Sequence, residues 1–188
     1  MAYFPMFVDI NDADCLIVGG GKVALRKVQV LLDFGANVFL VAKEISDDIL
    51  EIAKDNKCLR IENRAFVFSD LDEKAVVVVA TNDNDLNSEI SIACKKRAIP
   101  VNVVDDKEKC SFIFPAYVKE QNIVGAVSSA GNSPVIAQVL KKKLSEIITK
   151  DMGDLNEKLG DMRQELILKY PDEAKRKETV LKMIENIL

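Results

Sequence analysis

Three consecutive glycines near the N-terminus constrain the fold of this chain most strongly. They follow the apolar residues 15–18 and precede an amphipathic segment, an order typical of a strand, a tight turn and a helix. In the pattern G-x-G-x-x-[GA], Gly19 permits the turn, Gly21 lets the backbone approach a pyrophosphate, and Ala24 keeps the helix close to the strand. The N–H groups at the helix start attract an anion. The sequence therefore favours a dinucleotide site over an unrelated glycine-rich loop.

A phosphate loop of the Walker type is excluded by the residue after the glycines and lysine. Val23 stands where that loop requires a hydroxyl group for magnesium. The residues that we expect to bind a dinucleotide at this turn are Gly19, Gly20, Gly21, Lys22, Val23 and Ala24.

Composition and charge exclude several classes of partner. The 188 residues include 26 Lys and Arg against 30 Asp and Glu, a net charge of -4, so no basic excess favours nucleic acid. No stretch approaches the roughly 20 apolar residues that span a bilayer, and the N-terminus does not resemble a secretory leader. We therefore expect a cytoplasmic protein that binds neither nucleic acid nor a membrane.

The chain contains no histidine. Ser-His and Cys-His catalysis and histidine metal sites are thereby excluded, and acid-base chemistry has to come from Asp, Glu, Lys, Tyr or Cys. The cysteines, which we expect to be reduced and to serve as small packing residues, are Cys15, Cys58, Cys94 and Cys110. We assign no metal ligand.

Strands and helices alternate over the first part of the chain. The expected strands cover residues 15–18, 37–42, 59–61, 75–80 and 100–104. Because a strand buried on both faces of a parallel sheet has to be apolar throughout, the Ala and Val run at 75–80 indicates the centre of such a sheet. Ser46 is expected to cap the helix that follows the second strand. This alternation predicts an α/β fold with a Rossmann-like, doubly wound parallel sheet.

The pattern changes after residue 110. Two strand-like runs, 111–116 and 123–129, are joined by a polar segment and predict a β-hairpin. Ser133 and Pro134 are residue types preferred at the N-cap and first position of a helix, which we expect to continue to about residue 149. Its expected buried face consists of Ile136, Val139, Leu140, Leu144 and Ile147. Two more amphipathic helices follow.

Ligands of open α/β sheets bind beyond the carboxyl ends of the strands. The second strand ends at Ala42 without an acidic residue at its tip, and Lys43 and Glu44 follow it. Glu44 is one candidate to bind the adenosine ribose, whereas Lys43 would suit a 2′-phosphate, and we prefer NAD to NADP. After the valine-rich strand come Thr81, Asn82, Asp83 and Asn87, which either cap the next helix or contact the nicotinamide side of the cofactor.

Two further polar segments are candidates for chemistry. Asp105 and Asp106 follow the last predicted strand, and because neighbouring side chains alternate in direction, Asp105 is the better candidate to face the crevice. A solvated turn is the other interpretation. A second segment before the long helix forms either an anion-binding concavity suited to carboxylates or a plain capping loop. Its candidate substrate-binding residues are Ser128, Ser129, Gly131, Asn132 and Ser133.

The predicted organisation has three parts. Residues 1–113 form an NAD-binding Rossmann-like domain, residues 114–150 a dimerisation and substrate-binding region, and residues 151–188 a C-terminal helical domain. Because the apolar stripes of the last three helices need partner surfaces that so short a chain does not offer, we expect a homodimer.

These motifs together resemble precorrin-2 dehydrogenase, the dehydrogenase and ferrochelatase part of siroheme synthase. The resemblance covers almost the whole chain, and its motifs are Pro5-Met6-Phe7, the segment 15–21, Ala80-Thr81-Asn82-Asp83, Asn102-Val103-Val104-Asp105, Ser111-Phe112-Ile113 and the segment 127–134. It implies NAD-dependent oxidation of precorrin-2 to sirohydrochlorin on a homodimer with intertwined C-terminal halves. In some members Fe2+ insertion to give siroheme follows, and the motifs leave open which kind this chain is.

The resemblance also assigns roles to residues. The family's catalytic aspartate falls on Asp105, which in a chain without histidine is the candidate base. The many carboxylates of a tetrapyrrole such as precorrin-2 suit the loop from Ser128 to Ser133. An alternative function is a non-catalytic NAD(H)-sensing module with a helical dimerisation tail. That alternative predicts neither a carboxylate beside the nicotinamide nor a second anion loop.

Overall fold

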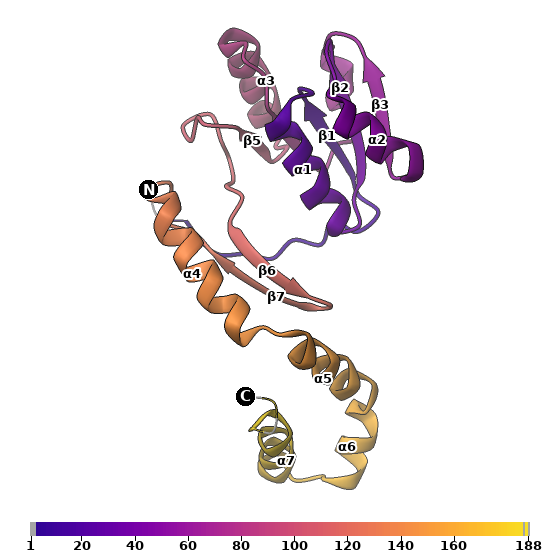
Figure 1. Ribbon diagram of the computed structural model, residues 1–188, viewed down its shortest axis with the longest axis vertical. Helices are drawn as coiled ribbons and strands as arrows, with labels where there is room; N and C mark the ends of the chain where they lie inside the picture. Colours follow the sequence, from indigo (N-terminus) through magenta and orange to yellow (C-terminus); the bar gives the residue numbers. More distant parts are fainter. Residues whose placement is uncertain (1–2, 186, 188) are drawn as a thin grey trace. The chain divides into compact units, whose positions relative to one another are not determined.

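The computed structural model describes residues 3–185 and 187 and contains two compact units (Figure 1). The first unit is Tyr3–Ile113, and the second begins at Phe114. Among the described residues, no helix combines the length and the apolar character that crossing a membrane requires.

The first unit is built on a five-stranded parallel sheet with the strand order β3-β2-β1-β4-β5. Because the chain moves outward from β1 first toward β3 and later toward β5, right-handed crossovers place α1 and α2 on one face and α3 on the other. This arrangement confirms the predicted Rossmann-like fold. The elements are β1 (Asp14–Val18), α1 (Lys22–Asp33), β2 (Asn37–Ala42), α2 (Asp47–Asp55), β3 (Leu59–Asn63), the 3-10 helix η1 (Phe68–Leu71), β4 (Val76–Val79), α3 (Asn84–Lys96) and β5 (Val101–Val103).

The core lies between the central strands and their helices. All four residues of β4 are buried, as are the last four of β1, in agreement with their apolar runs. On the helix side, Ala24, Val28 and Leu31 of α1 have at most 2% of their surface exposed. The cysteine prediction was right for Cys15 and Cys94, which are buried, and wrong for Cys58, which is exposed at the start of β3.

The described residues of the second unit form a hairpin and four helices. In the first strand of the hairpin the prediction was wrong, because the strand covers 116–120 instead of 111–116 and turns at Gln121, whose φ is +52°. The physical reason is that Ser111 pairs with β5, its backbone N–H donating to the Val101 carbonyl at 2.8 Å. The elements are β6 (Ala116–Glu120), β7 (Ile123–Val127), α4 (Pro134–Ile147), α5 (Lys150–Asp161), α6 (Arg163–Lys169) and α7 (Glu173–Glu185).

Helix α4 packs against the hairpin, and Ser133 caps it as predicted, with Oγ accepting from the N–H of Ile136 at 3.3 Å. The prediction that the apolar stripe of α4 is buried was wrong for a single copy of this chain. The side chains of Ile136, Val139, Leu140 and Ile147 are between 41% and 57% exposed, and Leu144 is half-buried. The hairpin covers one flank of α4, so most of the apolar stripe faces outward.

Candidate functional site

The glycine turn between β1 and α1 has the geometry that its sequence predicts. Gly19 has φ +122°, and a Cβ atom there would lie 2.3 Å from the carbonyl oxygen of Ala80. At Gly20 a Cβ atom would lie 2.1 Å from the carbonyl oxygen of Glu44. Both positions therefore require glycine, because any side chain would collide with backbone.

Gly21 has the opposite environment. No atom lies within 4 Å of the position that its Cβ would take, and it stands at the N-cap of α1 with no side chain bonded to the first N–H groups. Lys22 and Val23 are exposed beside it, whereas Ala24 is buried against the sheet. Open space before an uncapped helix fits a diphosphate group, whose charge the helix N-terminus favours.

The tip of β2 lies next to this turn. The backbone N–H of Ser46 donates to the Gly20 carbonyl at 2.9 Å and thereby ties the start of α2 to the glycines. Ser46 occupies the N-cap position, but its side chain makes no capping bond, in contrast to the expected cap. Lys43 and Glu44 are exposed at this tip, where Asn63 donates to the Lys43 carbonyl at 2.8 Å.

The segment after β4 is held by hydrogen bonds within itself. Asp83 caps α3, its carboxylate accepting from the N–H groups of Asp85 at 3.1 Å and Leu86 at 3.0 Å. Asn87 is buried and donates to the Thr81 carbonyl at 3.1 Å, while the Thr81 hydroxyl donates to Asn87 Oδ1 at 2.5 Å. The exposed Asn82 lies between these anchored residues. The capping interpretation therefore describes Asp83, and the cap fixes the backbone from which Asn82 projects.

Asp105 and Asp106 differ in environment, but both lie beyond β5 and Asp105 has a left-handed backbone, so side-chain alternation along a strand does not explain the difference. Asp105 is exposed directly beyond β5 and has φ +61°. Asp106 is half-buried and pairs with Lys109 at 3.0 Å, and the hydrogen bond from that lysine holds the pKa of the Asp106 carboxyl below its usual range. The Asp106 carboxylate is therefore paired with Lys109 within the loop, whereas Asp105 is exposed.

The sheet register brings the glycine turn and Asp105 to the same edge. Val18 pairs with Val79 and Val79 with Val103, so the residues that follow all three strands stand in one row. Neighbouring strands are roughly 4.8 Å apart, which puts the start of the Asp105 loop about 10 Å from the glycine turn. The first unit thus combines the glycine turn and an exposed carboxylate at the carboxyl edge of its sheet.

Two residues beside Asp105 were missed by the sequence analysis. Cys110 lies against the Asp105 loop, and Lys27 is half-buried on α1. Lys27 could have been noticed because it is a charged residue at helical spacing within the buried stripe of Ala24, Val28 and Leu31. No such signal marks Cys110, whose partners are backbone atoms of the loop and the side-chain amide of Asn102.

The serine loop belongs to the second unit and caps α4. Oγ of Ser128 accepts from the N–H of Ala130 at 3.0 Å, and Oγ of Ser129 accepts from the N–H of Ser133 at 3.2 Å. Gly131 has φ +79°, and both Gly131 and Asn132 are exposed. The capping interpretation therefore describes this loop, and each accepting hydroxyl retains its own proton for donation to an anion.

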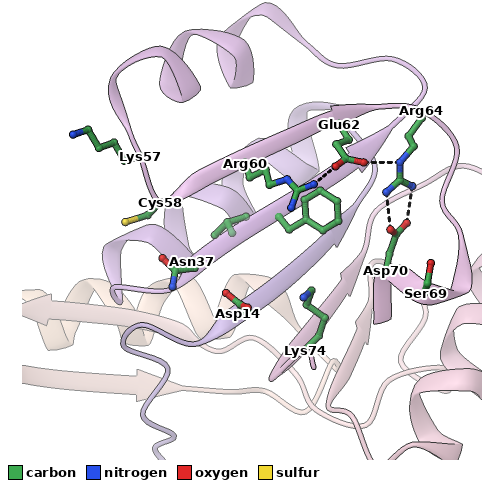
Figure 2. Close-up of a pocket in the computed structure, with 12 residues that line it drawn as sticks. Asp14, Asn37, Lys57, Cys58, Arg60, Glu62, Arg64, Ser69, Asp70 and Lys74 are labelled. Carbon is green, nitrogen blue, oxygen red and sulfur yellow. Dashed lines mark hydrogen bonds and ion pairs between the residues drawn. The ribbon is translucent and has the colours of Figure 1, made fainter. Parts of the chain in front are cut away.

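A separate hollow of about 480 Å³ lies on the sheet face near β2 and β3 (Figure 2). Its walls include Asp14 and Asn37, which begin their strands and so lie at the edge opposite to the glycine turn. Arg64 forms two bonds to the carboxylate of Asp70, at 2.8 and 2.6 Å. This hollow contains none of the predicted site residues.

Fold and site together define an NAD(P)-binding protein of the Rossmann-like class. A family model described as putative NAD(P)-binding matches residues 6–116, more than half of the chain. The siroheme synthase of Zymomonas mobilis is 42% identical over 171 residues, which are 91% of this chain and 36% of that protein. The siroheme synthase of Ruthia magnifica is 38% identical over 170 residues, 90% of this chain and 36% of the relative.

A solved structure of SirC, a precorrin-2 dehydrogenase, superposes with a TM-score of 0.73 and 25% identity, covering 98% of this chain and 100% of SirC. The chain belongs to the family of precorrin-2 dehydrogenases and siroheme synthases, as its motifs predicted. It spans about a third of the length of the curated relatives that it matches. The predicted nicotinamide dinucleotide cofactor is confirmed at the level of NAD(P).

Proposed function

We propose that this chain oxidises precorrin-2 to sirohydrochlorin with NAD as the hydride acceptor. The observation that carries the proposal is the match to SirC, a precorrin-2 dehydrogenase, over nearly the full length of both chains. The exposed Asp105 at the same sheet edge as the glycine turn supports it. A non-catalytic NAD(H) sensor would not require that carboxylate.

The cofactor is assigned to the carboxyl edge of the sheet. The residues from Gly19 to Ala24 would hold its pyrophosphate at the start of α1, and Glu44 would accept hydrogen bonds from the adenosine ribose. Lys43 is exposed at the same tip and would favour a 2′-phosphate, so affinities for NAD and NADP decide between the two cofactors. Thr81 and Asn82 would border the nicotinamide half.

The oxidation removes two hydrogens from the macrocycle, one as a hydride and one as a proton. Bound NAD+ supplies the hydride acceptor and becomes NADH. Asp105 takes the proton, because it is the carboxylate presented at the carboxyl edge while Asp106 is engaged with Lys109. The loop from Ser128 to Ser133 binds carboxylates of the substrate through its hydroxyl and backbone donors.

Iron insertion is a second reaction that we assign to the same carboxylate. When Fe2+ enters sirohydrochlorin as substrate, two pyrrole N–H protons have to leave, of which Asp105 would accept one and solvent water the other. Measuring siroheme formation from supplied sirohydrochlorin and Fe2+ tests this activity separately from the oxidation.

Residues 1–113 would then form the cofactor domain, residues 114–150 the dimerisation and substrate-binding region, and residues 151–188 a helical domain. A second copy of the chain is the proposed cover for the exposed stripe of α4.

The decisive experiment is an anaerobic incubation of the protein with precorrin-2 and NAD, followed by absorbance scans for sirohydrochlorin. Protein-dependent formation of sirohydrochlorin with one NADH per macrocycle supports the proposal. Binding of NADH without any turnover would instead favour the sensor.

A further inference from the structure

The chain turns sharply at Asp105, just beyond β5. Asp105 has φ +61°, in the left-handed region that few residues other than glycine, asparagine and aspartate adopt readily. It lies between β5 and residues that fold back along the edge of that strand. Such a conformation persists when the surrounding contacts fix it.

Cys110 supplies contacts on both sides of Asp105 along the chain. Its Sγ lies 3.2 Å from the backbone N and 3.2 Å from the carbonyl oxygen of Val103, and 3.2 Å from the carbonyl oxygen of Asp106. Burial raises the pKa of the Cys110 thiol, so the group remains protonated and able to donate. One sulfur atom therefore joins the residues before and after Asp105.

Lys27 of α1 interacts electrostatically with Asp105. It stands three residues after Ala24 on the stripe that faces the sheet, and it is half-buried. Burial lowers the pKa of Lys27, and the charge of Asp105 opposes this shift. Asp105 thus acts electrostatically on the Lys27 ammonium group, which belongs to the helix that follows the glycine turn.

We propose that Cys110 and Lys27 are positioning residues for Asp105, Cys110 by fixing the backbone of its loop and Lys27 by attracting its carboxylate toward the cofactor-binding helix. The role in catalysis rests on the proposed oxidation. The electrostatic interaction between Lys27 and Asp105 does not, and it is tested on its own.

The interaction between Lys27 and Asp105 is tested by NMR after reductive methylation of the lysines with ¹³C-formaldehyde. The Lys27 signal, assigned by its loss in Lys27→Arg, should titrate below the signals of exposed lysines. In Asp105→Asn it should titrate lower still, because an opposing charge has been removed, whereas Asp106→Asn should leave it unchanged. An identical Lys27 titration in wild type and Asp105→Asn refutes the interaction between the two residues, whatever activity the protein has.

The positioning role is tested by turnover of precorrin-2 in paired variants. Cys110→Ala should lower kcat by roughly tenfold, since small displacements of a catalytic group are costly, and Cys110→Ser should restore most of it because a hydroxyl also donates and accepts. Lys27→Met should likewise lower kcat and Lys27→Arg should recover it, with Arg26→Met on the exposed face as the control. The KM for NAD should stay constant throughout.

Two outcomes overturn the positioning role. One is equal kcat in Cys110→Ala and Cys110→Ser, together with equal kcat in Lys27→Met and wild type. The other is a change confined to the KM for NAD, which would assign both residues to cofactor binding. If the Lys27 titration responds to Asp105→Asn while wild-type protein produces no sirohydrochlorin, the interaction between Lys27 and Asp105 is supported and the proposed oxidation fails.

Discussion

Replacing Gly21 by aspartate should abolish cofactor binding and leave the fold intact. The backbone of Gly21 has φ -91° and ψ -171°, an extended conformation that any L-residue adopts, and its Cβ position has no neighbour within 4 Å. Aspartate is also a preferred N-cap residue, so α1 should be as stable in the variant as in the wild type, or more so. Gly19→Ala should behave in the opposite way, because its Cβ would collide with the Ala80 carbonyl.

The expected loss of affinity follows from the negative charge that the variant places in the open space before α1. A carboxylate about 4 Å from one phosphate charge costs roughly 4 kcal/mol at an effective dielectric constant of about 20. Since about 1.4 kcal/mol corresponds to a tenfold change in affinity, Gly21→Asp should weaken NADH binding by roughly a thousandfold. Occlusion of the space adds to this loss.

The assay is titration calorimetry with NADH, accompanied by thermal unfolding of each variant. Gly160→Asp is the matched control, because a Cβ at Gly160 on α5 also meets no atom within 4 Å and that position lies outside the predicted site. The control should bind NADH as the wild type does. If Gly21→Asp retains wild-type affinity while its unfolding temperature is unchanged, the glycine turn is not the pyrophosphate site.

Three further predictions concern the base, the dimer and acid stability. Asp105→Asn should reduce precorrin-2 oxidation by about 10² to 10⁴-fold with unchanged NAD affinity, and Asp106→Asn by much less, in steady-state assays; full activity of the first variant would exclude it as the base. Val139→Glu, at a side chain 53% exposed, should shift sedimentation from dimer to monomer, and a wild-type monomer at micromolar concentration would contradict the dimer. Burial works to raise the pKa of Asp70, but its hydrogen bonds with Arg64 lower it overall. Stability from this pair is therefore present above the unfolded pKa of about 3.9 and lost as pH falls through the folded pKa, so Asp70→Asn should flatten the acid side of the stability curve, and an unaltered curve would refute the linkage.

Features that depend on local sequence were predicted well. The strand at 37–42 and the helix beginning at Pro134 occur at the expected residues, because period-two and period-3.6 patterns and capping residues act within a few positions. The glycine turn also belongs to this group, since its collisions with Ala80 and Glu44 follow from the close approach that such a turn imposes. The carboxyl edge of the sheet then follows from the alternation of strands and helices.

Features that depend on contacts between distant residues were decided by the tertiary structure. The segment around Ser111 looks like a hairpin strand but pairs with the edge of β5, because an unpaired edge offers backbone groups that a nearby segment can satisfy. Leu140 lies on a clear apolar stripe and is still 41% exposed, since periodicity defines a face without supplying what covers it. Cys110 contacts backbone atoms of the Asp105 loop, and Lys27 of α1 interacts electrostatically with Asp105. The sequence thus determined the elements, the fold class and the polar residues at the carboxyl edge, whereas packing across the sheet decided which groups support them, because such contacts join residues that no local pattern relates.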